Sequence, residues 1–176
     1  MTTCKNCIHW GLCDVFYPEG AECCSSFKHN AEETIMKIML DKGAKMPTRA
    51  HPWDAGLDLY APMEDGVWMI SPAGGSITID TGVHVEIPEG CVGLIKSKSG
   101  LMVNRDIVTD GTIDSHYTGS IRVKLFNHSM CMRYDIHPGD KIAQLVILPC
   151  LLPDLELVTE LGSTDRGDNG FGSTGR

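Results

Sequence analysis

Apolar and polar residues alternate along much of the chain after residue 33. From Ile77 to Ile87 the apolar positions share one parity, whereas Asp80, His84 and Glu86 occupy the other. Alternation of this kind predicts strands that are buried on one face. We expect strands within the segments 34–50 (TIMKIMLDKGAKMPTRA), 77–87, 91–97 (CVGLIKS), 120–129 (SIRVKLFNHS), 141–149 (KIAQLVILP) and 155–158 (LELV).

Turn-forming sequences separate these segments at short intervals, among them PEG at 88–90 and HPGD at 137–140. The one expected helix is short and begins at Ser99, whose hydroxyl could cap it, within SGLMVNRD (99–106). Short strands at regular spacing are typical of all-β proteins. The fold class predicted from the pattern is therefore an all-β sandwich or barrel with one short helix.

Composition divides the chain into three parts. Residues 1–33 hold five of the eight cysteines, residues 34–160 carry the strand pattern, and residues 161–176 form a Gly-rich arm. The last fifteen residues contain five glycines and almost nothing to bury. We expect this arm to be mobile until a ligand orders it.

Size and charge exclude several classes of protein. A chain of 176 residues with 42% hydrophobic residues fits one globular domain with a small appendage. Its longest apolar stretch is broken by Gln144 and Pro149, and its first residues lack the pattern of a secretory signal. We therefore expect a cytoplasmic protein without a membrane span. The formal charge of −8 also disfavours direct nucleic-acid binding, so an anionic ligand needs a locally built site.

Two segments could bind phosphate. The arm, RGDNGFGSTG (166–175), combines one cation, one aromatic ring and small residues whose N–H groups could surround phosphate oxygens. It could equally be a disordered polar terminus. In KSKSGLM, Lys96 and Lys98 precede the expected helix start at Ser99, where charge and free N–H groups could meet an anion. An ordinary capped helix with solvated lysines explains that segment as well.

Three further segments carry polar residues beside apolar ones. In DGTIDSHYTGSIRV (110–123), Asp114 could act as a base or form an Asx turn, and Tyr117 could recognise a ligand or simply pack. His116 is better explained as a surface side chain than as a catalyst. Asp58 and Gln144 each lie in an apolar strand, where a buried carboxylate or amide needs partners. Either residue could be purely structural.

Taken in order, the five segments resemble the five motifs of the homotrimeric deoxyuridine triphosphate nucleotidohydrolases (dUTPases), from about Ile35 to Arg176. The resemblance implies a jelly-roll-like fold of the β-clip type, in a homotrimer with shared active sites. It implies that Asp114 is the general base and that Tyr117 lies against the deoxyribose. The backbone around Gly111 and Ile113 would bind the uracil edge.

The resemblance also assigns the phosphate contacts. It implies that Lys98, Ser99, Gly100 and Gln144 bind phosphate oxygens, and that Asp58 supports the network of metal, water and phosphate. The arm residues expected to contact the γ-phosphate and to cover the uracil are Arg166, Phe171, Gly172, Ser173 and Thr174.

Four positions depart from the usual family pattern. Lys98 stands where the family usually has Arg, so a planar two-pronged contact becomes a point charge. The other departures are Leu57, His116 and Thr118.

The implied activity is hydrolysis of dUTP to dUMP and pyrophosphate by attack of water on the α-phosphorus. This reaction limits uracil in DNA and supplies dUMP. Mg²⁺ would be held through substrate phosphates and water. Two alternatives remain open at this point: a dCTP deaminase-like enzyme of the same fold, and a regulatory binding protein on a dUTPase scaffold.

The cysteines of residues 1–33 could bind zinc in a segment too small to hold itself together by apolar burial. The expected ligands are Cys4, Cys7, Cys13 and one of Cys23 or Cys24. Reduced cysteines without a metal, or disulfides in an oxidising compartment, are the alternatives.

Overall fold

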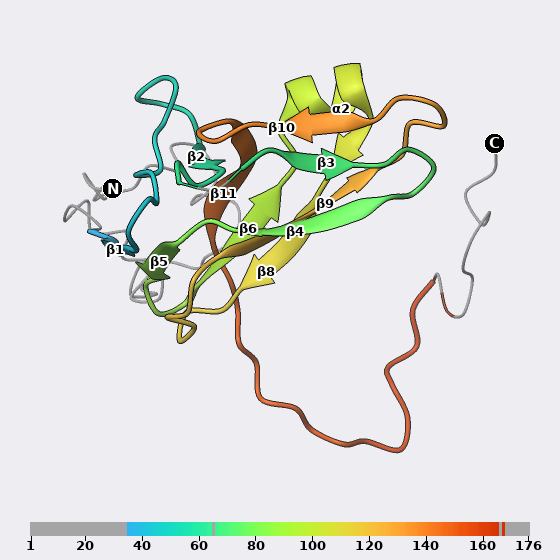
Figure 1. The fold of residues 1–176 in the computed structure, drawn as a ribbon. Helices are drawn as coiled ribbons and strands as arrows, with labels where there is room; N and C mark the ends of the chain where they lie inside the picture. Colours follow the sequence, from blue (N-terminus) through green and yellow to red (C-terminus); the bar gives the residue numbers. More distant parts are fainter. Residues whose placement is uncertain (1–34, 65, 166, 168–176) are drawn as a thin grey trace. The chain divides into compact units, whose positions relative to one another are not determined.

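The structure, a computed structural model, describes residues 35–64, 66–165 and 167. Apart from one short helix, the regular secondary structure of the described part consists of β-strands joined by loops (Figure 1). In chain order its elements are β1 (Lys37–Leu40), β2 (Gly56–Tyr60), β3 (Trp68–Ile70), β4 (Ser76–Asp80), β5 (Val83–Glu86), β6 (Cys91–Lys96), α2 (Ser99–Arg105), β7 (Ile107–Val108), β8 (Asp110–Ile113), β9 (Arg122–Asn127), β10 (Tyr134–Ile136) and β11 (Lys141–Pro149).

The strands form four antiparallel groups. The largest is a four-stranded sheet in the order β2-β11-β6-β8, and a three-stranded sheet has the order β4-β9-β7. The strand β1 pairs with β5, and β10 pairs with β3. The predicted all-β class with one short helix is therefore confirmed for the described residues.

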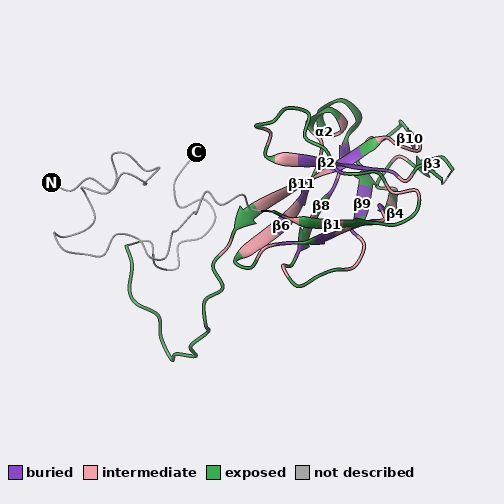
Figure 2. Cartoon of the chain, turned by 90° about the vertical axis from the view of Figure 1, so that its left-hand side faces the viewer, coloured by how far each residue is buried: buried purple, intermediate pink, exposed green. Residues whose placement is uncertain are grey.

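The core follows the predicted alternation. Ile79, Val83 and Val85 are buried, whereas Asp80 and Glu86 on the other parity are exposed. Figure 2 colours the described chain by burial, and buried stretches lie along its strands. Burial of one apolar side chain contributes about 1.5–3 kcal/mol, so this alternation fixes which face of each strand points inward. The alternation continues from β4 into β5, which belong to different sheets, and Gly82, with a φ of +65°, lies between them.

Two expectations need correction. The segment 155–158 is not a strand: Leu155 is 97% exposed and Leu157 is 100% exposed, so its apolar side chains find no partner within the described chain. The residue that caps α2 is Lys98, not Ser99, and its side chain makes no capping hydrogen bond. Among the described residues no helix is long and apolar enough to span a membrane.

Candidate active site

Strand pairing brings three predicted residues onto one face of the four-stranded sheet. Gln144 of β11 lies directly opposite Asp58 of β2 on one side and Lys96 of β6 on the other. Directly opposite residues of antiparallel strands point to the same face. Gln144 also donates a hydrogen bond from Nε2 to the carbonyl oxygen of Ser97, at 3.1 Å. The partly buried amide thus has the partner that its apolar strand requires.

Asp58 is a buried carboxylate between two lysines. Its side chain is 6% exposed and forms ion pairs with Lys98 and, at 2.7 Å, with Lys141. Burial raises the pKa of Asp58, but the hydrogen bonds and positive charges of Lys141 and Lys98 outweigh burial and hold the pKa below its usual value. The carboxylate therefore stays ionised and holds two ammonium groups at one place.

Lys141 is a charged neighbour of the predicted site residues that the sequence reasoning missed. It begins β11, where an irregularity in the pairing separates it from Ala143, and its ammonium group reaches back to Asp58. The sequence does place Lys141 three residues before Gln144, in the predicted strand 141–149, which could have indicated a second cation beside Lys98. Its pairing with Asp58 depends on the register of β2 and β11, which the sequence does not specify.

The segment after β6 leads directly into the helix. The carbonyl oxygen of Lys98 accepts hydrogen bonds from the N–H groups of Leu101 and Met102, at 3.0 and 2.9 Å. Ser97 ties the segment to the strand below it, because its hydroxyl both donates to the carbonyl of Thr109 and accepts from the N–H of Thr109, each at 2.9 Å. Ser99 and Gly100 remain exposed at the start of α2.

Gly56 is required by the position of Gln144. A Cβ atom on Gly56 would collide with Oε1 of Gln144 and lie 3.1 Å from its Cδ. Any side chain at this position would therefore displace the amide.

The third predicted segment forms the turn between β8 and β9. Gly111 and Ile113 lie in β8, opposite Ile95 and Gly93 of β6. The exposed Asp114 comes directly after β8, so its carboxylate is open to solvent. The N–H of Tyr117 donates to the carbonyl oxygen of Asp114 at 3.0 Å, which closes the start of the turn.

The ring of Tyr117 lies over the backbone of its own turn. Its hydroxyl donates to the carbonyl oxygen of Ser120 at 2.9 Å, and the side chain is partly exposed. A Cβ atom on Gly119 would lie only 2.5 Å from this hydroxyl and 2.6 Å from Cζ. Glycine at position 119 is what allows the ring to occupy this place.

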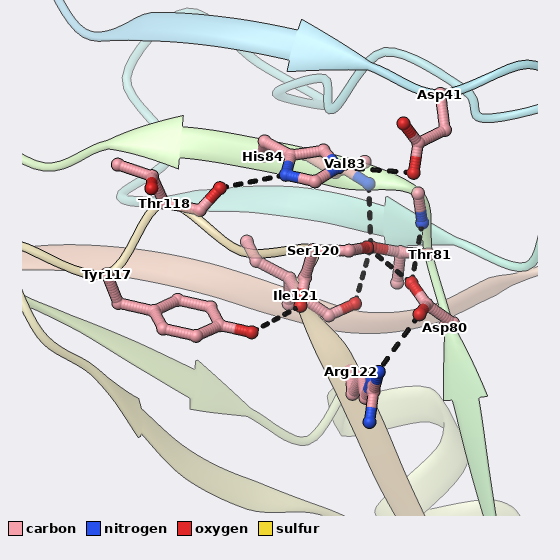
Figure 3. A network of polar contacts seen from close by, with 11 residues as sticks. Asp41, Asp80, Thr81, Val83, His84, Tyr117, Thr118, Ser120, Ile121 and Arg122 are labelled. Atoms are coloured by element: carbon pink, nitrogen blue, oxygen red, sulfur yellow. Dashed lines mark hydrogen bonds and ion pairs between the residues drawn. The ribbon is translucent and has the colours of Figure 1, made fainter.

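A polar network fixes the end of the turn to the neighbouring strands (Figure 3). The Asp80 carboxylate accepts hydrogen bonds from the hydroxyl of Ser120 and from the N–H of Gly82, and it pairs with Arg122 at 3.4 Å. Beside it, the buried hydroxyl of Thr81 donates to the carbonyl of Ile121 at 2.7 Å. The turn is therefore anchored at its β9 end.

The two groups of predicted residues lie apart within one chain. Ile113 is opposite Gly93, whereas Gln144 is opposite Lys96 and binds Ser97. The four residue steps from Gly93 to Ser97 span roughly 13 Å at ~3.3 Å per residue. The sheet thus brings Asp58, Lys98 and Gln144 together at one end of β6, and places Asp114 with Tyr117 towards the other.

Several predicted residues lie outside the described part of the chain. They are Arg166, Phe171, Gly172, Ser173 and Thr174 of the arm and Cys4, Cys7, Cys13, Cys23 and Cys24. Among the described residues no group of three or more His, Cys, Asp or Glu side chains could hold a metal ion.

Comparisons with known proteins show the family. A family model described as dUTPase matches residues 42–175. A deoxyuridine 5′-triphosphate nucleotidohydrolase of Rabbitpox virus is 38% identical over 149 residues, which are 85% of this chain and 98% of the relative.

Solved structures give the same result. The chain is similar to a Staphylococcus bacteriophage 80alpha dUTPase with dUPNHPP, at 32% identity and a TM-score of 0.73, over 81% of this chain and 99% of that one. It is also similar to a mutant dUTPase from phage phi11 of S. aureus, described as coordinating a structural Mg(II) ion. The identity there is 31% and the TM-score 0.65, over 72% of this chain and 97% of that one. Because the family model covers most of the sequence and the viral relative matches over nearly its full length, the chain belongs to the dUTPase family.

Proposed function

We propose a division of roles among the site residues of this dUTPase-family enzyme, which hydrolyses dUTP to dUMP and pyrophosphate. Asp114 is the general base that orients and deprotonates the attacking water. Its exposed position directly after β8 supports this role, because a base must reach a water molecule in front of the α-phosphorus. The reaction limits uracil in DNA and supplies dUMP.

The nucleoside lies against the turn. Tyr117 packs against the deoxyribose, and the backbone of Gly111 and Ile113 binds the uracil edge. The hydrogen bond from the Tyr117 hydroxyl to the Ser120 carbonyl supports this proposal, because it fixes the ring beside Gly119, where the ring would exclude a ribose 2′-OH by contact.

The triphosphate lies at the other end of β6. Lys98, Ser99, Gly100 and Gln144 contact its oxygens, and Asp58 holds Lys98 in position. Lys141 adds a second ammonium group to this cluster. The arm contributes Arg166, Gly172, Ser173 and Thr174 at the γ-phosphate, and Phe171 covers the uracil.

One active site then needs more than one copy of the chain. A separation of roughly 13 Å along β6 is too large for the two groups of one chain to form a single compact site around the reacting phosphate. A homotrimer in which neighbouring subunits each supply one group resolves this difficulty. The observation that carries the proposal is this separation, combined with membership of the dUTPase family.

Mg²⁺ fits the donor set without a protein cage. The nearest buried carboxylate, Asp58, already pairs with two lysines, so the substrate phosphates and water would hold the ion. When bound, Mg²⁺ reduces the negative charge on the phosphate oxygens. The chain's own cations at positions 98 and 141 add to that charge balance.

Two further proposals concern the parts outside the described residues. The arm, residues 161–176, orders on substrate. Residues 1–33 form a separate segment, whose zinc site of Cys4, Cys7, Cys13 and Cys23 or Cys24 is a prediction that the comparisons do not support. A cytoplasmic location likewise stays a prediction.

Pyrophosphate release from dUTP, dCTP, dTTP and UTP, with and without Mg²⁺, tests the function. We expect selective release from dUTP that depends on Mg²⁺. Deamination of dCTP would indicate the alternative dCTP deaminase-like enzyme, which the family match does not favour. Tight dUTP binding without turnover would indicate a regulatory binding protein.

A further inference from the structure

The imidazole ring of His84 connects two segments that are far apart in the sequence. His84 lies in β5 opposite Met39 of β1, and its side chain is 17% exposed. Nδ1 lies 2.8 Å from the carbonyl oxygen of Thr118, in the turn that carries Tyr117. On the other side, Nε2 lies 3.1 Å from Oδ2 of Asp41 (Figure 3).

Both partners of this ring can only accept hydrogen bonds. A backbone carbonyl and an ionised carboxylate offer lone pairs and no proton. A neutral imidazole carries one N–H and can therefore satisfy only one of them, whereas the imidazolium ion donates from both nitrogens. Both contacts of His84 can be hydrogen bonds at the same time only in the doubly protonated ring.

The charges around His84 favour the same state. The hydrogen bond to the Thr118 carbonyl, the hydrogen bond to Asp41 and the negative charges of Asp41 and Asp80 raise the pKa of His84, while burial opposes them. The cations nearby are already paired, Arg122 with Asp80 and Lys37 with Glu86. Because its pKa is raised, the ring stays protonated to a higher pH than an ordinary histidine. As the pH rises through that raised pKa, the ring loses one of its two hydrogen bonds.

The Thr118 carbonyl oxygen, which contacts His84, lies next to Tyr117 in the turn between β8 and β9. Thr118 directly follows Tyr117 and precedes Gly119, over which the tyrosine ring lies. The Asp80 network holds the β9 end of this turn, and the contact between Tyr117 and Asp114 closes its start. His84 holds the peptide between them.

We propose that His84 is a positioning residue for dUTP hydrolysis, which holds the Thr118 peptide, and with it the Tyr117 ring, in the place where the deoxyribose binds. This inference rests on the proposed role of Tyr117. The neutral ring carries one N–H and must release either Thr118 or Asp41, so in either tautomer it no longer ties Thr118 to Asp41. We therefore expect dUTP to bind less well once His84 has lost a proton, so that KM rises with pH.

The protonation state is measured without nucleotide. NMR titration of the His84 ring in the full chain should give a pKa above 6.5, the ordinary value for histidine. In Asp41→Asn, which retains a polar partner but removes the charge, the pKa should fall. A ring pKa at or below 6.5 in the wild-type protein overturns the proposal, whether or not any variant folds.

The effect on the reaction is measured as KM and kcat for dUTP from about pH 6 to about pH 8.5. In His84→Ala we expect KM to increase about three- to tenfold at the lower pH, with kcat changed much less. His84→Gln retains one donor that does not titrate, so its KM should vary less with pH than the wild-type KM. His128→Gln, at an exposed histidine beyond β9, is the matched control and should follow the wild-type profile.

Each outcome decides a different point. If the wild-type enzyme does not hydrolyse dUTP, the proposed function fails, while the NMR titration still judges the state of His84. If dUTP is hydrolysed but His84→Gln keeps the wild-type dependence of KM on pH, His84 does not position the turn. Should His84→Gln not fold, the KM profile of Asp41→Asn answers the same question, because a lower His84 pKa must move the rise in KM to lower pH.

Discussion

The buried carboxylate of Asp58 forms an ion pair with Lys98, the residue that directly precedes helix α2. This pair connects the middle of β2 with the segment that leaves β6. Because Lys141 joins the same carboxylate, one buried acid sets the positions of two cations. The end of the site proposed to bind phosphate is therefore organised by charge within the chain before any nucleotide arrives.

Replacing Asp58 by Asn should destabilise the protein at neutral pH by about 1–3 kcal/mol, because two lysines lose their common partner. The pKa of Asp58 is lowered in the folded state, so its contribution is present above the unfolded value of 3.8 and is lost as the pH falls through the folded pKa. The difference between Asp58→Asn and wild type in urea unfolding should shrink below about pH 4.

The matched control is Glu86→Gln, which breaks an exposed pair with Lys37 at 3.1 Å. We expect an effect of less than about 1 kcal/mol. Equal effects of the two substitutions would show that the Asp58 cluster has no special role in stability.

Gly119→Ala should impair the reaction through Tyr117. The added methyl group would overlap the tyrosine hydroxyl and ring, so the ring must move from the place proposed for the deoxyribose. A misplacement of this size should reduce kcat/KM for dUTP about ten- to a hundredfold. Gly66→Ala is the control, since Gly66 is exposed and a Cβ there meets no atom within 4 Å. Unchanged kcat/KM in Gly119→Ala would remove Tyr117 from the substrate site.

Truncation after Asp165 should abolish catalysis and leave folding intact. The segment from Leu151 to Asp165 is largely exposed and contributes nothing to the buried core, so removal of residues 166–176 should not unfold the sheets. Loss of the proposed arm contacts should lower kcat/KM about a hundredfold or more. Deletion of Arg176 alone is the control and should be nearly neutral. A truncated chain that no longer forms the wild-type oligomer on sizing chromatography would show that the arm is structural.

Deletion of residues 1–33 should leave dUTP hydrolysis nearly unchanged, because the matched family region starts at residue 42. Metal analysis of the full chain, purified without chelator, tests the zinc prediction separately. About one zinc per chain, lost in Cys4→Ser with Cys7→Ser, would support the site. Folded protein without zinc would end that prediction.

Much of the fold could be predicted from the sequence, because apolar and polar residues alternate with a period of two along a half-buried strand. The residues from Ile77 to Ile87 show this directly. The short helix is predicted from Ser99 as a capping residue, and it begins at Ser99 although Lys98 is its cap. The same signal misled at 155–158, since alternation shows that a strand has an apolar face but not that a neighbour exists to cover it. The need of Asp58 and Gln144 for partners was also visible in their apolar surroundings.

The sequence does not show which residues are the partners of Asp58 and Gln144. Lys141 reaches Asp58 only because of the register between β2 and β11. The close approaches of Gly56 to Gln144 and of Gly119 to Tyr117 depend on side-chain directions in the folded chain. The pairing of His84 with the Thr118 carbonyl joins β5 to a distant turn. These relationships depend on tertiary structure, and a single sequence carries no local signal for them.

The most direct measurement compares kcat for dUTP hydrolysis in Asp114→Asn with the wild-type value. Asparagine keeps the shape of the side chain but cannot take a proton from water, so kcat should fall by about 10²–10⁴ while KM changes much less. Asp154→Asn, at an exposed carboxylate beyond β11, is the control and should retain nearly full turnover. If Asp114→Asn kept more than about half of the wild-type kcat, Asp114 would not be the base.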